Sequence, residues 1–197
     1  MSERTSWQRI ARRIRVPLGF VFAAVFLWLA RPTGKTMLLS LLLVIPGVWL
    51  RAYAAGYVRK NAELTFTGPY AYTRNPLYLG SMLIAFGFAA AAGSWVILIA
   101  LAALFAVIYI PTIQSEEGYL RQQFAGFDEY AAKVPRLLPR LTPASFPADQ
   151  NASLGRFSWG QWQHHREYNA LMGAGAIYLA LAVRLFLNHH GVTGGPR

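Results

Sequence analysis

The fold is decided by an uncharged stretch in the middle of the chain, NPLYLGSMLIAFGFAAAAGSWVILIALAALFAVIYIPTIQS, residues 75–115. None of its 41 residues carries a formal charge. As one straight helix it would extend about 60 Å, twice the hydrocarbon thickness of a bilayer, which is about 30 Å. The stretch must therefore fold back on itself, and Gly93 and Ser94 near its midpoint are typical turn residues. It predicts a hairpin of two membrane helices.

Three further apolar segments flank this hairpin. Residues 16–30 hold no charge and lie between arginines whose side chains can reach the two membrane interfaces. Residues 36–58 are interrupted only by Arg51, and residues 168–188 only by Arg184. The pattern predicts an all-α, polytopic integral membrane protein of about five transmembrane helices.

The chain divides into three parts on this interpretation. Residues 1–35 form a basic segment and the first membrane helix, residues 36–140 form the membrane core, and residues 141–197 form a linker and a C-terminal membrane helix. The linker is rich in Pro, Ser, Ala and Asn. The chain as a whole shows no internal repeat.

Composition supports the membrane class. Of 197 residues, 55% are apolar and 14% are charged, against about 25% charged in soluble domains. The net charge of +11 fits either a nucleic-acid partner or basic loops against anionic lipid. The long apolar runs favour membrane lipids, so we expect no nucleic-acid partner. The chain has no cysteine, which excludes a thiol nucleophile and Cys-ligated metals; the paired histidines lack metal-site spacing, so we expect no metal.

Basic residues orient the helices. Five arginines lie within residues 4–15, and further Lys and Arg side chains follow the second and fourth apolar segments. Cytoplasmic loops carry such an excess of positive charge. We therefore expect an N-terminus and two longer loops in the cytoplasm, at the inner membrane if the chain is bacterial.

Arg51 is the first residue with functional potential. An arginine within an apolar helix costs roughly 2.5–3.5 kcal/mol on insertion scales. Either it lies near the cytoplasmic end and reaches the interface, or its guanidinium binds a carboxylate or phosphate. Arg51 by itself leaves both interpretations open.

Two more polar clusters lie on the expected cytoplasmic side. In the first, Asn75 and Pro76 are typical of a helix start, with Asn75 as the cap and exposed amides that favour an anion. An ordinary interfacial turn fits equally. In the second, Glu116 and Glu117 point about 100° apart on a helix, so at most one faces a site. The inward one can bind a ribose diol, an ammonium or a sulfonium; the alternative is a solvated helix end paired with Arg121.

Taken together, the clusters resemble a known family. The segment GPYAYTRNPLYLG at 68–80, the hairpin, Glu116–Glu117, Tyr130 and VPR at 134–136 follow one another as in the isoprenylcysteine carboxyl methyltransferases. This integral-membrane group includes the phospholipid methyltransferases. The resemblance covers roughly residues 45–140.

The resemblance implies S-adenosylmethionine as cofactor, entering from the cytoplasm without a Rossmann domain, and a lipophilic, lipid or prenyl substrate entering from the bilayer. It implies catalytic roles for Arg51, nearest the substrate, and Glu117. The residues it places around the cofactor are Tyr72, Arg74, Asn75, Tyr78, Leu79, Gly80, Glu116, Glu117, Tyr130 and Arg136. One departure is Asn75, where the family usually has histidine, so a protonatable group is missing there.

Other interpretations stay open. The acceptor is a carboxylate, which needs no base, or a lipid amine, for which Glu116 or Glu117 would serve as base. An NADPH-dependent membrane reductase of the sterol-reductase type is the alternative enzyme, and a non-catalytic membrane protein is the third. The sequence does not indicate an oligomeric state.

Overall fold

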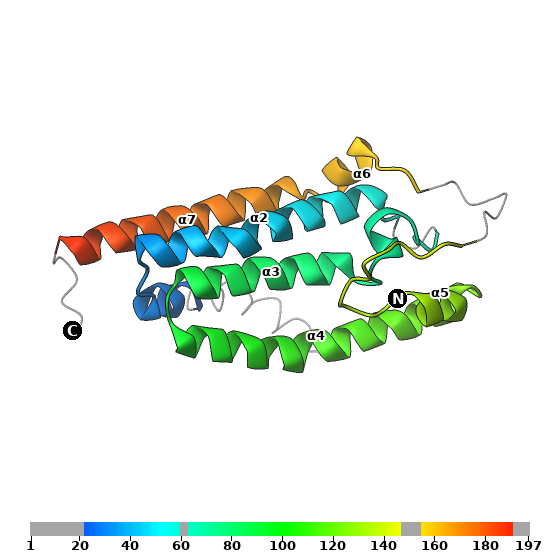
Figure 1. Cartoon of the computed structure of the whole chain (residues 1–197), viewed down its shortest axis with the longest axis horizontal. Coiled ribbons are helices and arrows are strands. Elements are labelled where there is room, and N and C mark those ends of the chain that lie inside the picture. Colours follow the sequence, from blue (N-terminus) through cyan, green and yellow to red (C-terminus); the bar gives the residue numbers. More distant parts are fainter. Residues whose placement is uncertain (1–21, 60–62, 147–154, 191–197) are drawn as a thin grey trace, which may run out of the picture.

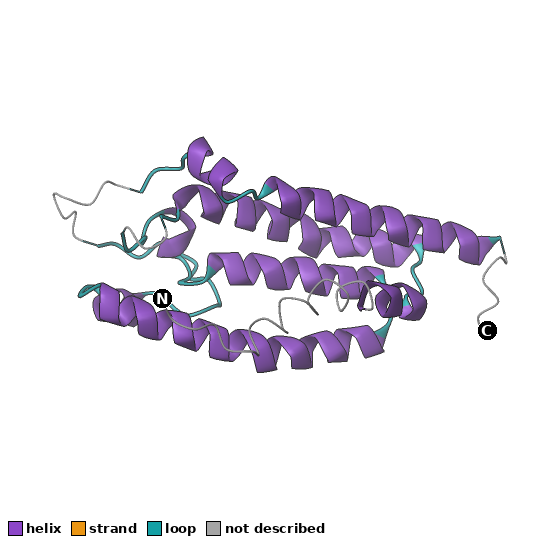
Figure 2. Cartoon of the chain, turned by 180° about the vertical axis from the view of Figure 1, so that it is seen from behind, coloured by secondary structure: helices purple, strands orange, loops and turns teal. Residues whose placement is uncertain are grey.

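A computed structural model describes residues 22–59, 63–146 and 155–190 (Figure 1). The regular structure of these residues is helical throughout (Figure 2). After helical residues 22–29, the elements are α2 (Gly34–Tyr57), the 3₁₀ turn η1 (Gly68–Ala71), α3 (Pro76–Ala91), α4 (Trp95–Gln123), α5 (Phe127–Lys133), α6 (Trp159–His164) and α7 (Tyr168–His189). The all-α prediction is confirmed.

Helices α2, α3, α4 and α7 run side by side as an elongated bundle (Figures 1 and 2). Three of them, α2, α4 and α7, are long and apolar enough to cross a membrane, while α3 is a shorter apolar helix of 16 residues. The predicted hairpin is confirmed, since α3 ends at Ala91 and α4 begins at Trp95. Of the first predicted span only residues 22–30 lie within the described part.

Glycines allow the closest helix contact in the bundle, between α2 and α3. A Cβ atom added at Gly47 would lie 2.9 Å from the carbonyl oxygen of Gly80. One added at Gly80 would lie 2.9 Å from the oxygen of Gly47 and 2.7 Å from Arg51 Cγ. The two backbones therefore touch, which is how small residues act between membrane helices. At the far end of α3, Gly93 adopts φ +63°, the left-handed conformation that favours glycine in the hairpin turn.

Residues 155–190, which we name the C-terminal arm, pack along α2. The Ser158 amide donates to the Gly56 carbonyl (2.9 Å), and the Phe157 ring covers Gly56 so closely that a Cβ there would lie 2.2 Å from it. Further along, the hydroxyls of Ser40 and Tyr178 are hydrogen-bonded. The arm thus contacts α2 over much of its length.

Candidate functional site

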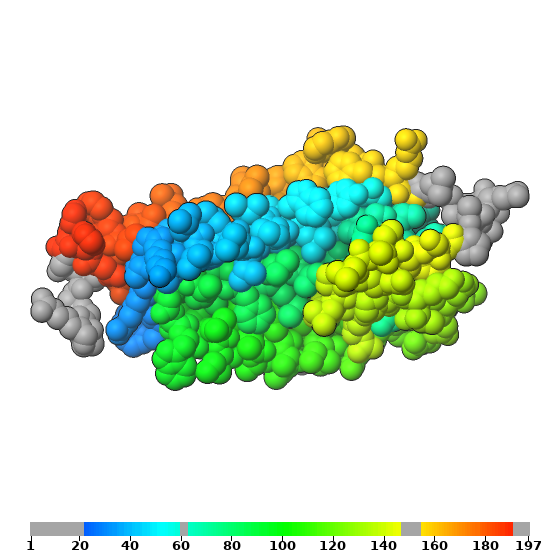
Figure 3. Space-filling view, in the orientation of Figure 1, coloured from blue at the N-terminus to red at the C-terminus, as the bar shows by residue number. Residues whose placement is uncertain are grey.

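Backbone pairing gathers the two polar motifs at one end of the bundle. The Arg74 amide donates to the Pro135 carbonyl (3.0 Å), and the Arg140 amide donates to the Tyr72 carbonyl (2.9 Å). The Thr73 hydroxyl donates to the carbonyl of Leu137 (3.0 Å). Consequently the segment after α5 covers the end of the bundle where α2 ends and α3 begins (Figure 3). Residues 61 to 68 positions apart in sequence become neighbours there.

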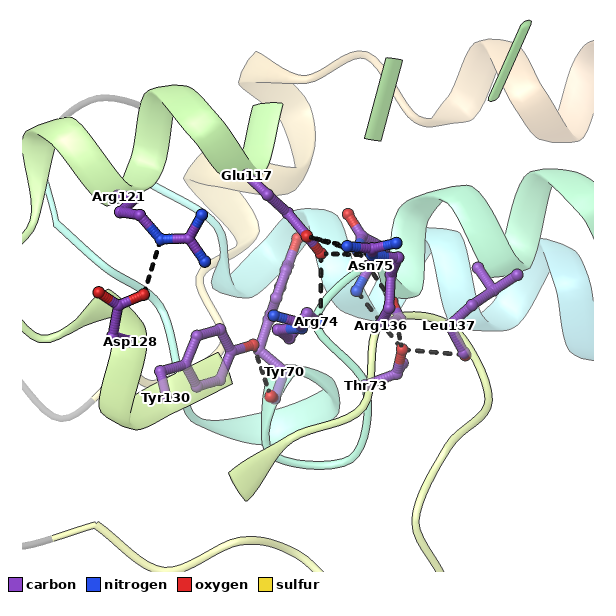
Figure 4. Close-up of polar contacts among 10 residues, drawn as sticks. All are labelled: Tyr70, Thr73, Arg74, Asn75, Glu117, Arg121, Asp128, Tyr130, Arg136 and Leu137. Atoms are coloured by element: carbon purple, nitrogen blue, oxygen red, sulfur yellow. Dashed lines mark hydrogen bonds and ion pairs between the residues drawn. The ribbon is translucent and has the colours of Figure 1, made fainter. Parts of the chain in front are cut away.

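Glu117 is the centre of a charged cluster beneath this cover (Figure 4). Its side chain is 8% exposed, and it accepts hydrogen bonds from Arg136 Nε (3.1 Å) and Nη2 (2.8 Å). Arg74 Nη2 lies 3.4 Å from the same carboxylate. The hydrogen bond to Glu117 raises the pKa of Arg136, so this guanidinium stays charged. Two cations thus share one carboxylate, and the buried Arg74 Nε has no hydrogen-bond partner within residues 22–59, 63–146 and 155–190.

Asn75 plays a different role from the one its position suggested. Pro76 occupies the first helical turn of α3, as predicted. The Asn75 side chain, however, makes no capping hydrogen bond, so that expectation is wrong. Its Nδ2 instead donates to the carbonyl of Arg136 (2.9 Å), because the covering segment lies within reach. Asn75 therefore fastens the Arg136 segment to the start of α3.

The two adjacent glutamates face different neighbours, as the helical geometry predicted. Glu116 is exposed but accepts a hydrogen bond from the Tyr78 hydroxyl (2.9 Å) across the hairpin. Arg121 does not pair with either glutamate and instead donates to Asp128 (2.7 Å). The alternative of a solvated helix end paired with Arg121 is therefore wrong.

Arg51 is held by a carboxylate from the C-terminal arm. Its Nε donates to Glu167 Oε2 (3.1 Å) and its Nη2 to Glu167 Oε1 (2.9 Å), while Nη1 donates to the Ser81 hydroxyl. The Glu167 side chain is 7% exposed. Arg51 is thus paired within the bundle. Gly80 makes room for it, because a side chain there would strike Arg51 Cγ.

Tyr70 is a buried residue near several of these charged groups. Its side chain is buried, and its hydroxyl has no hydrogen-bond partner among the residues that the structure describes. The Tyr130 hydroxyl donates to the Tyr70 carbonyl (2.9 Å), which fixes the backbone beneath it (Figure 4). Burial raises the pKa of Tyr70, as do nearby Tyr130, Glu116 and Glu167, whereas Arg51 opposes them. The hydroxyl therefore stays protonated at neutral pH.

The other residues singled out from sequence lie at the edge of this site. Tyr72 is 37% exposed and lines a pocket of about 650 Å³ together with Trp49, Tyr53, Gly68, Pro69, Ala71 and Pro143. Trp49 and Tyr53, whose rings stack at 5.2 Å, lie two residues either side of Arg51. Because each residue of a helix turns by about 100°, both rings point to nearly the opposite side of α2 from Arg51. Leu79 is half-buried next to Tyr78 in the first turn of α3.

Sequence comparison assigns the core that carries this site. Residues 35–126 match the model of the phospholipid methyltransferase family, from the start of α2 to just past α4. The match includes Arg51, Tyr70, Arg74 and both glutamates of α4, so the resemblance drawn from the motifs is confirmed. In the part of the chain that the structure describes, three helices are long and apolar enough to cross a membrane, which fits an integral membrane protein, and the family match extends over two of them, α2 and α4.

Two curated relatives extend the comparison. The chain is 34% identical over 137 residues to the cobalt-zinc-cadmium resistance protein CzcN of Cupriavidus metallidurans. This alignment covers 65% of this chain and 62% of that protein. It is 38% identical over 95 residues to the nickel-cobalt-cadmium resistance protein NccN of Alcaligenes xylosoxydans xylosoxydans, 48% of this chain and 44% of that protein. The chain thus spans less than two thirds of either relative. No solved structure matches it.

Two functional candidates were missed from sequence, Tyr70 and Glu167. Glu167 is the only acidic residue after Asp149, and it directly precedes the last apolar helix. Arg51 is the lone charge in the second apolar segment. Two lone charges of opposite sign beside apolar helices are a signal for a buried pair, because each is costly without the other.

Proposed function

We propose that the chain is an S-adenosylmethionine-dependent methyltransferase that transfers a methyl group to a lipophilic acceptor. The observation that carries the proposal is the Glu117 cluster, in which the buried Nε of Arg74 has no partner in the described part of the chain. A buried unpaired donor costs about 1–3 kcal/mol, so an anionic ligand group would stabilise it. The cofactor carries such a group in its carboxylate.

The residues fit the other parts of this cofactor as well. Its sulfonium is a cation, and Glu116, exposed on α4 beside Tyr78, provides a carboxylate for it or for the ribose diol. Arg74 and Arg136, beside Glu117, would hold the carboxylate end. Asn75, Tyr78, Leu79 and Gly80 form the start of α3 next to them, and Tyr130 supports the turn below. Tyr72 would then border the entrance.

The cofactor supplies, when bound, a methyl group activated by the positive sulfur. An acceptor lone pair forms the new bond to the methyl carbon while the carbon–sulfur bond breaks, and its electron pair stays on sulfur. The protein would contribute by positioning the acceptor atom in line with the activated methyl group and by excluding water from the site. Arg51 would orient the polar end of the acceptor. The bilayer around α2 and α7 would hold its apolar part.

The site would face the cytoplasm on this proposal. Basic residues gather in the segments that follow α2 and α4, which border the Glu117 cluster. Such segments favour the cytoplasmic side of a membrane. The cofactor would enter from water there, and the acceptor would enter from the lipid. A carboxylate and a lipid amine both remain acceptor classes to be assayed.

The proposal is tested by calorimetric titration of the detergent-purified chain with S-adenosylhomocysteine and, separately, with NADPH. We expect saturable binding of S-adenosylhomocysteine and none of NADPH. Glu117→Gln should weaken that binding, because Arg74 and Arg136 lose the charge that positions them. Glu129→Gln is the matched control, since Glu129 pairs with Lys133 on the exposed face of α5. Binding of NADPH alone would favour the reductase, and binding of neither ligand to folded protein would refute the proposal.

A further inference from the structure

The Tyr70 hydroxyl is a buried hydrogen-bond donor without a partner in the part of the chain that the structure describes. The residue is 7% exposed. Buried polar groups are nearly always satisfied, and an unpaired one costs about 1–3 kcal/mol. Its position is nevertheless fixed, because Pro69 precedes it in η1 and the Tyr130 hydroxyl binds its carbonyl. Holding this unpaired donor in place therefore lowers the stability of the fold.

The neighbouring charges are occupied with one another. Arg51 and Glu167 satisfy each other at two points, and Glu116 accepts from Tyr78. All three charged groups lie close enough to influence the ionisation of Tyr70, yet none is hydrogen-bonded to its hydroxyl. The hydroxyl is thus hydrogen-bonded to neither the Arg51–Glu167 pair nor the Glu116–Tyr78 pair. Its hydrogen is therefore available to a ligand group.

The backbone just before Glu167 has an unusual conformation. Arg166 has φ +52°, a left-handed conformation that is uncommon for a residue other than glycine. This turn joins α6 to α7 and brings the Glu167 carboxylate to Arg51. Strain of this kind persists only where the surroundings enforce it, and it is frequent beside functional sites. The arm beyond the family match thereby supplies the carboxylate that pairs with Arg51.

We propose that Tyr70 is a ligand-binding residue whose hydroxyl donates a hydrogen bond to an oxygen in the polar headgroup of the methyl acceptor. This inference rests on the proposed function and adds a contact to it. The Arg51–Glu167 pair is neutral as a whole and stays intact, so the headgroup is bound by hydrogen bonds beside the pair. Only an atom with a free lone pair can accept from the phenol, which selects an oxygen over a protonated or quaternary nitrogen.

The first test needs no ligand. Tyr70→Phe removes an unsatisfied donor and keeps the ring, so the melting temperature of the purified chain should stay the same or rise. Tyr130→Phe is the matched control, because it removes a hydroxyl that is hydrogen-bonded. We expect it to lower the melting temperature by about 2–4 °C, the shift for roughly 1 kcal/mol in a chain of this size. A comparable fall for Tyr70→Phe would overturn the inference, since the hydroxyl would then be structural.

The second test separates acceptor from cofactor. Wild type and Tyr70→Phe are titrated with S-adenosylhomocysteine, and then with N-acetyl-S-farnesylcysteine and with phosphatidylethanolamine in detergent. We expect unchanged affinity for S-adenosylhomocysteine and about 3- to 10-fold weaker binding of an acceptor probe, as for one lost hydrogen bond. A wild type that binds S-adenosylhomocysteine but shows no Tyr70-dependent binding of either probe overturns the inference. A wild type that fails to bind S-adenosylhomocysteine refutes the proposed function instead, and the melting temperatures still decide the role of Tyr70.

Discussion

Arg51 and Glu167 lie 116 positions apart in sequence and form a two-point ion pair between α2 and the start of α7. The parallel donors of the guanidinium match the two carboxylate oxygens, the geometry in which such pairs are strongest. The pair connects the matched family core to the C-terminal arm. It also compensates a charge that the second span would otherwise bury alone.

Loss of Glu167 should destabilise the chain because it leaves Arg51 unpaired. Breaking a buried pair from one side costs about 3–5 kcal/mol, and the effect here will be smaller because the Arg51 side chain is 26% exposed. We expect Glu167→Ala to lower the melting temperature more than the double variant Arg51→Met, Glu167→Met. Tryptophan fluorescence during heating in detergent measures both. Equal melting temperatures would show that the pair contributes little.

Arg74 and Arg136 should differ in their importance for ligand binding. The Arg74 side chain is 13% exposed and its Nε is unpaired among the described residues, whereas the Arg136 side chain is 48% exposed. Arg74→Gln should therefore weaken binding of S-adenosylhomocysteine more than Arg136→Gln does. Titration calorimetry gives both affinities, with Arg121→Gln as a control on the exposed Asp128 pair. The reverse order would contradict the assignment of Arg74 as the buried anion contact.

Gly47 should tolerate no side chain. Alanine there would force the α2 and α3 backbones apart or distort them, which costs about 1–3 kcal/mol. We expect Gly47→Ala to lower the melting temperature. Gly173→Ala on α7 should not, since nothing lies within 4 Å of its added Cβ. Similar behaviour of the two variants would argue against the tight contact between the helices.

The orientation of the bundle can be measured with single cysteines, because the chain has none of its own. Lys35 and Gln122 are exposed at opposite ends of the hairpin bundle. A membrane-impermeant maleimide added to intact cells should label Lys35→Cys, and Gln122→Cys should react only after the membrane is opened. The opposite pattern would place the Glu117 cluster outside the cytoplasm.

Apolar length explains why most of the fold was predictable. The span predicted at residues 168–188 is α7, Tyr168–His189, and the predicted hairpin turn lies between α3 and α4. Charge-free runs of this length have few alternatives in a membrane. The position of the first predicted span falls mostly outside the described residues, and α3 is shorter than a usual span.

The site was only partly predictable, because its contacts join distant segments. Helical periodicity showed that Glu116 and Glu117 point apart, and the family resemblance brought Arg74 and Arg136 near them. Neither argument could place the arm, whose Glu167 lies beyond the matched family segment. Nor could they show that Asn75 binds the Arg136 carbonyl, since that contact depends on how the covering segment folds back.

The most direct measurement of the central claim is methyl transfer itself. Membranes containing the wild-type chain, the Glu117→Gln variant or no added chain are incubated with S-adenosylmethionine labelled in the methyl group, and the lipophilic fraction is extracted. We predict label in the extract from wild-type membranes and near-background label for Glu117→Gln, provided that both proteins are folded and equally abundant. Background label from folded wild type, or equal label from the variant, would contradict the assignment of this cluster as a methyl-transfer site.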